Sequence, residues 1–349
     1  MNKHFTRMGD GTIVYMTEEE IRADIYAGVS DAAMRGKIPP LSKEEMEHLY
    51  QIITMPGIIV GVDYGKQVVS TTDQGADTMG TESAVGLDRA IQVQILERCI
   101  GSDSTDIGFT DYNFKAVKPI VTYEATVMQR CLSESIIPVL YGGMPNLGFY
   151  TKPDGPIDNW AELLPAGKVN EALAAQEEAV SHAVRDIVHV AEKMYHAGAD
   201  GINLDTCGAA GDADFLAALQ ATEEIKRKFP DLGVEIGMAG EFVLGMHGKL
   251  TYDGVRLAGA FPHQQVKLAE KAGATIFGPV VNTNSNKSFA WNIARTCTFI
   301  KACVEVANIP VHPNVGMGVG GIPMCEVIPC DVVSRADKAL IEICKIDGL

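Results

Sequence analysis

Carboxylate and amide side chains recur where short apolar segments end, and they carry most of the chemistry that the sequence offers. Asp205 directly follows the apolar run GINL, and Glu241 closes the run GVEIGMAGE. Two carboxylates in one place can bind a cation or act as acid and base. The alternative for Asp205 and Asp212 is that they cap the helix that follows. The other polar candidates at such positions are Asp111, Asp212, His247, Asn282, Asn284 and His312.

Short β-rich runs alternate with helical patterns, which predicts a parallel sheet with helices outside it. Seven or eight such units favour a TIM-like (β/α)8 barrel, whose active site lies at the carboxyl ends of the strands. The expected helices span 170–197, with Gly198 as C-cap, 213–228 and 287–307. The expected strands span 57–63, 105–111, 136–143, 199–206, 233–240, 274–281 and 309–316.

A junction of helix, small turn and strand occurs three times, and its last copy is CKIDGL at 344–349. This copy stops where its strand should begin, which predicts a barrel that is incomplete at its C-terminal end. The alternative is a frayed terminal tail. We expect one barrel domain over 1–349, with an N-terminal extension over 1–56 and barrel units over 57–349.

The bulk properties exclude several classes of protein. The formal net charge is −16, so a nucleic-acid partner is not expected. We find no signal peptide and no apolar run long enough to span a membrane. Eight scattered cysteines without a dense framework are typical of reduced thiols in a cytoplasmic protein. Cys325 and Cys330 could form part of a thiolate metal site, but no second pair accompanies them, so we expect no bound metal.

Several long stretches resemble the dimethylamine methyltransferase family, and the resemblance runs from MGDG (8–11) to the last residue. The N-terminal part around 66–90 matches less well. The strongest stretches are DYNFKAVKPIV (111–121), IPVLYGGMPNLGFYTKPDGP (137–156), ADGINLDTCGAAGDADF (199–215), IGMAGEFVLGMHGKLTYDGVRLAG (236–259), FPHQQ (261–265), GPVVNTN (278–284) and VGMGVGGIPM (315–324).

This resemblance implies a (β/α) barrel that moves a methyl group from dimethylamine to the Co(I) of a cognate corrinoid protein, leaving monomethylamine. The pathway is methylamine-dependent methanogenesis. The corrinoid (cobalamin) is carried by the partner protein, so no cofactor is expected on this chain. A homo-oligomer is expected for the full-length protein.

The family's central residue is pyrrolysine, which follows a segment like Ile346-Asp347-Gly348-Leu349. The resemblance therefore implies pyrrolysine immediately after Leu349, and a 349-residue form that is inactive without it. Its imine carbon can accept an amine, which no standard side chain does well. Asp205 and Glu241 suit a catalytic role beside a cationic adduct. The residues expected to bind the substrate are Asp111, Asp212, Asn282, Asn284 and His312.

Two other functions stay open at this point. One is a barrel methyltransferase or decarboxylase that uses zinc or ordinary acid and base residues. The other is a remnant without catalytic activity that only docks a corrinoid protein.

Overall fold

The computed structural model describes residues 3–63, 65–73, 102–108, 139–143, 147–209, 211–245, 248–325 and 328–349. The chain divides into two compact units. The first unit combines both ends of the chain, residues 1–72 and 278–349, with residues 76–105. The second unit comprises residues 73–75 and 106–277. The expected division into one barrel domain and an extension over 1–56 stays a prediction.

A parallel sheet forms the framework of the second unit. Its strands are β4 (Ser102–Gly108), β5 (Val139–Gly143), β6 (Gly201–Cys207), β7 (Gly233–Met238) and β10 (Ile276–Gly278). The strand order is β10-β7-β6-β5-β4-β3, where β3 is Val68–Asp73. Two of the boundaries between the units along the chain fall within β4 and β10. The mixed α/β class is therefore confirmed. Within the described residues β10 and β3 are the two ends of this order, so a closed barrel is not confirmed.

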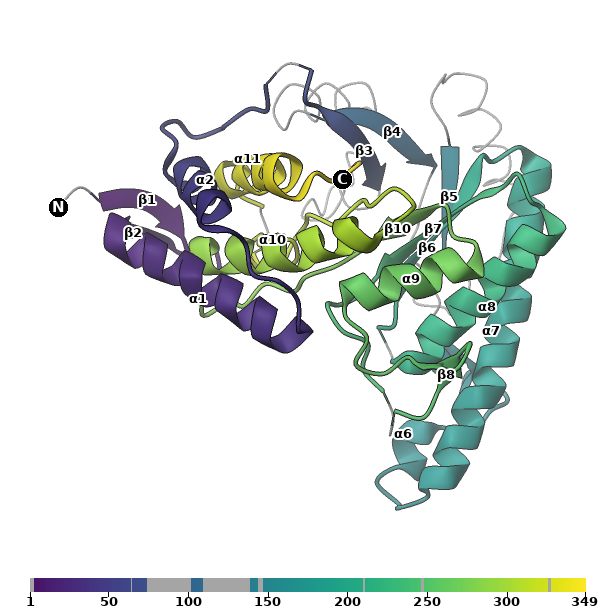
Figure 1. The fold of residues 1–349 in the computed structure, drawn as a ribbon. Coiled ribbons are helices and arrows are strands. Elements are labelled where there is room, and N and C mark those ends of the chain that lie inside the picture. The colour runs from purple at the N-terminus through teal and green to yellow at the C-terminus, as the bar shows by residue number, and fades with distance from the viewer. Residues whose placement is uncertain are drawn as a thin grey trace, which may run out of the picture. The chain divides into compact units, whose positions relative to one another are not determined.

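Helices follow the strands of the second unit in the expected alternation (Figure 1). α7 (Val169–Ala197) ends at Gly198, whose left-handed conformation (φ 96°) closes the helix as predicted. The further elements are η2 (Leu147–Tyr150), α6 (Trp160–Leu163), α8 (Asp212–Lys228), β8 (Thr251–Tyr252), β9 (Val255–Arg256) and α9 (Pro262–Ala272).

The first unit is helical and centres on α10 (Phe289–Val306), most of whose side chains are buried. α1 (Glu18–Gly36) packs along α10 (Figure 1), and a side chain at Gly28 would collide with the carbonyl of Trp291. Asp31 and Arg295 join the same two helices through an ion pair of 2.7 Å. The remaining elements are the hairpin β1 (Lys3–Arg7) and β2 (Ile13–Thr17), α2 (Lys43–Thr54), α11 (Cys330–Ala339) and the π-helix η3 (Leu340–Cys344).

No described helix of either unit is both long and apolar enough to cross a membrane.

Two of the expected strands are wrong. Residues 57–63 form no strand, because side chains rather than a neighbouring strand bind their carbonyl groups. The Arg335 guanidinium donates to the carbonyls of Gly57 and Ile58, and Lys338 Nζ donates to that of Gly61. Residues 309–316 also form no strand, since Pro310 and Pro313 lack the N–H that a ladder requires.

Candidate functional site

A polar stripe crosses two neighbouring strands of the second unit. Asn203 of β6 pairs in register with Glu235 of β7, and alternate residues of a strand share one face of the sheet. The opposite face carries the buried apolar side chains Ile202, Leu204, Val234 and Ile236. Asn203 and Glu235 are each only 6% exposed, although a polar side chain on such a face would ordinarily reach water.

Asp205 extends this stripe at the carboxyl end of β6. A Cβ atom on Gly237 of β7 would lie 2.8 Å from Asp205 Oδ1, so the carboxylate lies directly over that glycine. Only glycine leaves this room, because any other residue would displace the Asp205 side chain. Gly237 thus leaves space for the Asp205 carboxylate beside Glu235.

The backbone departs from regular strand geometry where it presents Asp205. The register between β6 and β7 shifts between Leu204 and Cys207, as in a β-bulge. Thr206 has a φ of 56°, in the left-handed region that residues with a branched side chain rarely adopt, and its N–H donates to Asp205 Oδ1 at 2.7 Å. Strain of this kind concentrates at functional sites, where it fixes a side chain in place.

Burial, and then the charge of Asp205, raise the pKa of Glu235 to about 8. The Glu235 carboxyl therefore holds its proton at neutral pH, beside the Asp205 carboxylate. Its Oε2 atom has no hydrogen-bond partner among the described residues, and the same is true of Asn203 Oδ1. The stripe offers one negative charge, one exchangeable proton and unused hydrogen-bonding oxygens.

Two further predicted site residues follow these strands: Asp212 begins α8 after β6, and Glu241 lies on the loop after β7. The ends of the two strands touch, since the N–H of Ala239 donates to the carbonyl of Cys207. Glu241 is buried, with 6% exposure. Asp212 is fully buried in the first turn of α8, but the N-cap position belongs to Gly211, so Asp212 does not cap the helix.

His312 of the first unit lies against the segment Ile346–Leu349. A Cβ atom on Gly348 would lie 2.5 Å from His312 Nε2 and 2.6 Å from Cε1, so the ring packs flat on this glycine. The N–H of Val311 donates to Asp347 Oδ2 at 3.0 Å, which fixes the segment alongside. Burial lowers the pKa of His312 to about 4, so the imidazole is neutral, and its Nδ1 has no partner among the described residues.

Two of the remaining predicted residues lie on a surface loop, and the other two lie outside the described residues. Asn282 and Asn284 are exposed in the first unit. The Asn284 side chain accepts from the N–H of Asn286 at 2.9 Å and so shapes its own loop. Asp111 and His247 lie outside the described residues. Substrate binding by Asp111, Asn282 and Asn284 stays a prediction, as does substrate binding by Asp212 and His312.

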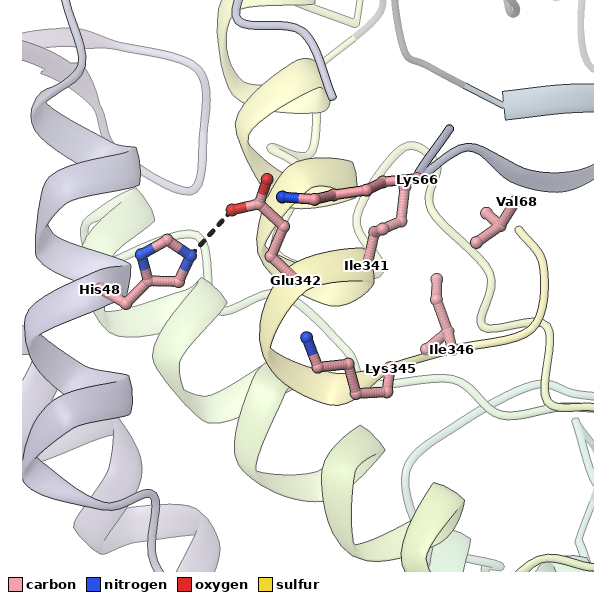
Figure 2. Close-up of a pocket in the computed structure, with 7 residues that line it drawn as sticks. All are labelled: His48, Lys66, Val68, Ile341, Glu342, Lys345 and Ile346. Carbon is pink, nitrogen blue, oxygen red and sulfur yellow. Dashed lines mark hydrogen bonds and ion pairs between the residues drawn. The ribbon is translucent and has the colours of Figure 1, made fainter. Parts of the chain in front are cut away.

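A pocket of about 410 Å³ in the first unit offers a third candidate. Figure 2 shows His48 and Glu342 joined by a hydrogen bond of 2.8 Å at its wall, with Lys66 nearby. Lys338 Nζ also binds Glu342, at 2.7 Å, so the carboxylate already has two partners. We interpret this wall as a structural ion-pair network. The lining residues are His48, Lys66, Val68, Ile341, Glu342, Lys345 and Ile346.

The zinc alternative concerns Cys325 and Cys330, of which the first is partly exposed and the second exposed. Among the described residues no group of three or more His, Cys, Asp or Glu side chains is placed to bind a metal ion.

The sequence interpretation missed Glu235 and Asn203. The available signal was a charged or amide residue inside an otherwise apolar strand, at GVEIGM and GINLD. A strand buried on both faces has no ordinary use for such a residue. Glu235 was therefore as strong a candidate for a functional residue as the polar residues at the strand ends.

One comparison covers almost the whole chain. The sequence matches a family described as dimethylamine methyltransferase over residues 2–349. The match includes the polar stripe on β6 and β7 and the segment that ends at Leu349.

Proposed function

Because the chain belongs to the dimethylamine methyltransferase family, a family of transferases, we propose that it transfers a methyl group from dimethylamine to the Co(I) of a cognate corrinoid protein. The products are monomethylamine and the methylated corrinoid. The carboxyl pair of half-buried Asp205 and buried Glu235 carries the proposal, since dimethylamine is a cation near neutral pH and a carboxylate favours a nearby cation.

The residues of this chain act on the substrate by binding and orientation. Asp205 holds the positive charge, while Glu241 on the adjoining loop manages the proton that the amine carries. Glu235 and Glu241 are buried from water, which strengthens the electrostatic contacts that they make. A methyl group must also be held in line with the attacking cobalt, and rigid strand ends provide such positioning.

The electrophile is proposed to be pyrrolysine following Leu349. When present, it supplies an imine carbon that accepts the amine and makes it a better leaving group. The neighbouring residues fit such a group: the neutral His312 ring packs on Gly348, and its Nδ1 has no partner among the described residues. The 349-residue form is therefore proposed to lack methyl transfer.

The finer points of architecture and assembly are also proposals. We infer that the parallel strands belong to a closed (β/α)8 barrel, in line with the polar stripe on one face of β6–β7 and the apolar opposite face. The corrinoid belongs to the partner protein, the active form is a homo-oligomer, and the reaction takes place in the cytoplasm.

The test is dimethylamine turnover by full-length protein produced with pyrrolysine decoding, in the presence of the reduced corrinoid protein. Glu241→Gln should lower kcat by about 100-fold, the usual contribution of acid–base catalysis. Glu223→Gln is the matched control, since Glu223 is an exposed residue of α8. Turnover by the 349-residue chain alone would refute the requirement for pyrrolysine, and near-normal turnover by Glu241→Gln would remove that residue from the mechanism.

A further inference from the structure

Two buried oxygens on the β6–β7 stripe are unused. Asn203 Oδ1 and Glu235 Oε2 have no hydrogen-bond partner among the described residues, and both side chains are 94% buried at 6% exposure. A buried polar atom without a partner is destabilising, because it has lost its hydrogen bonds to water and gained none in the protein. Most buried polar atoms in proteins have a hydrogen-bond partner, and a bound ligand is one way to provide it.

A negative charge lies beside these oxygens. Asp205 Oδ1 is seated over Gly237, the residue two positions after Glu235 on β7 and therefore on the same face. The charge of Asp205 acts on Glu235, whereas β10 on the other side of β7 contributes no ionisable residue. Cys207, the other ionisable residue of β6, is a neutral thiol, because burial raises its pKa well above the usual value.

We propose that Asn203, Asp205 and Glu235 form a binding site for a small ammonium ion with N–H donors, and that the ion displaces the proton of Glu235. The identification of the ligand as dimethylammonium rests on the proposed function. The ligand class itself follows from the side chains, which offer one negative charge and several acceptors.

A secondary ammonium ion satisfies this set of groups. It carries one positive charge and two N–H donors, which match the Asp205 carboxylate and an unused oxygen of Asn203 or Glu235. On binding, the Glu235 O–H bond breaks and its proton passes to the solvent buffer, while the amine keeps both of its own hydrogens. The site then holds two carboxylates and one cation. The net charge of the chain, −16, favours the approach of a cation.

The proton release has a defined pH range. The pKa of Glu235 is about 8 in the protein without ligand, and a nearby cation lowers it. Binding should therefore release close to one proton at pH 7, and almost none above pH 9, where Glu235 is already ionised. This measurement needs no substitution, so it tests the proposal even where a variant fails to fold.

The experiment is isothermal titration calorimetry of the 349-residue chain with dimethylammonium chloride, in two buffers of different ionisation enthalpy at pH 7 and at pH 9. Glu235→Gln should bind with similar affinity, because glutamine resembles the protonated carboxyl, but should release no proton. Asp205→Asn should weaken binding at least about tenfold, since a charge-assisted hydrogen bond is lost. Glu223→Gln should behave as the wild type in both respects.

Two other cations test whether binding requires the N–H donors of the ligand. Tetramethylammonium carries the same charge without a donor and should bind more weakly than dimethylammonium. Sodium chloride at the same concentration should not compete. Equal binding of sodium, unchanged affinity in Asp205→Asn, or proton release that persists in Glu235→Gln would each overturn the proposal.

The outcome is separable from that of the proposed function. Ammonium binding with proton release but without methyl transfer by the full-length protein would retain the site and refute the function. Methyl transfer without any effect of Asp205→Asn on binding would do the reverse.

Discussion

The stripe on β6–β7 and the segment around His312 share one packing feature, but burial shifts the pKa of their ionisable groups in opposite directions. In each, a polar side chain lies directly on a glycine: Asp205 on Gly237, and His312 on Gly348. In the stripe, burial favours the protonated form of Glu235, whereas in the His312 segment it favours the unprotonated ring. Both groups are therefore neutral near pH 7, although one is an acid and the other a base.

The difference shows what burial does to an ionisable group. Desolvation penalises the charged form, so it raises the pKa of an acid and lowers that of a base. The two regions should consequently respond to pH in opposite directions. Three experiments on the 349-residue chain test this contrast between the two regions.

The largest effect concerns Glu235. Its pKa is about 8 in the folded chain against an ordinary 4.5, so in this range the folded chain keeps a proton that the unfolded chain has lost. The free energy of unfolding should therefore fall by roughly 3–4 kcal/mol between pH 5 and pH 8 through this group. Glu235→Gln should remove this slope and be the more stable protein at pH 8, as measured by urea unfolding across the pH range.

The control for this slope is Glu223→Gln, because Glu223 is exposed and its replacement should leave the wild-type profile unchanged. If wild type and Glu235→Gln showed parallel profiles, Glu235 would not be protonated in the folded state. The stripe would then carry two negative charges, and the contrast with His312 would disappear.

The second effect separates the two glycines. A methyl group at Gly348 would meet three atoms of the rigid, buried His312 ring, so Gly348→Ala should lower the free energy of unfolding by about 3 kcal/mol. A methyl group at Gly237 would meet the end of a flexible carboxylate, so Gly237→Ala should cost about 1 kcal/mol. Urea unfolding at pH 7 measures both.

Gly61→Ala supplies the baseline, because a Cβ atom there would meet no other atom within 4 Å. Combining Gly348→Ala with His312→Ala should recover part of the lost stability, since the second change removes the ring. Full additivity of these two substitutions would show that the ring and Gly348 are not in contact.

The third effect concerns the pKa of His312. Its pKa is about 4 in the folded chain against an ordinary 6.5, so the unfolded chain gains a proton first as the pH falls. The stabilisation is complete above pH 6.5 and should fall by about 2 kcal/mol between pH 7 and pH 5. The stability difference between wild type and His312→Gln should shift by this amount. Replacement of the exposed His189 by glutamine should shift nothing.

The long amphipathic segments made much of the fold predictable. The helices expected at 170–197, 213–228 and 287–307 agree with α7, α8 and α10 to within about two residues. The strands at 199–206 and 233–240 likewise form β6 and β7. Local hydrophobic periodicity specifies these elements, and tertiary contacts do not override it.

The failures arise where distant side chains decide. An apolar run such as 57–63 resembles a strand, but Arg335 binds its carbonyls from a helix nearly 280 positions away, which no local pattern reveals. The sequence placed Asp205 and Glu241 at strand ends, and the structure has Asp205 near the carboxyl end of β6 and Glu241 on the loop after β7, while their catalytic roles stay predictions. The role of Glu235 depends on its burial beside Asp205, and burial is a property of the folded chain.

The division of the first unit between both ends of the chain has a consequence for synthesis on the ribosome. α1 packs on α10, yet about 250 residues separate Gly36 from Phe289. At a translation rate of about 5–20 residues per second, α1 emerges roughly 12–50 s before its partner helix exists. Its apolar face, which includes Ile21, Ile25 and Val29, must stay soluble through that interval, and a nascent-chain chaperone is the natural protector of such a face.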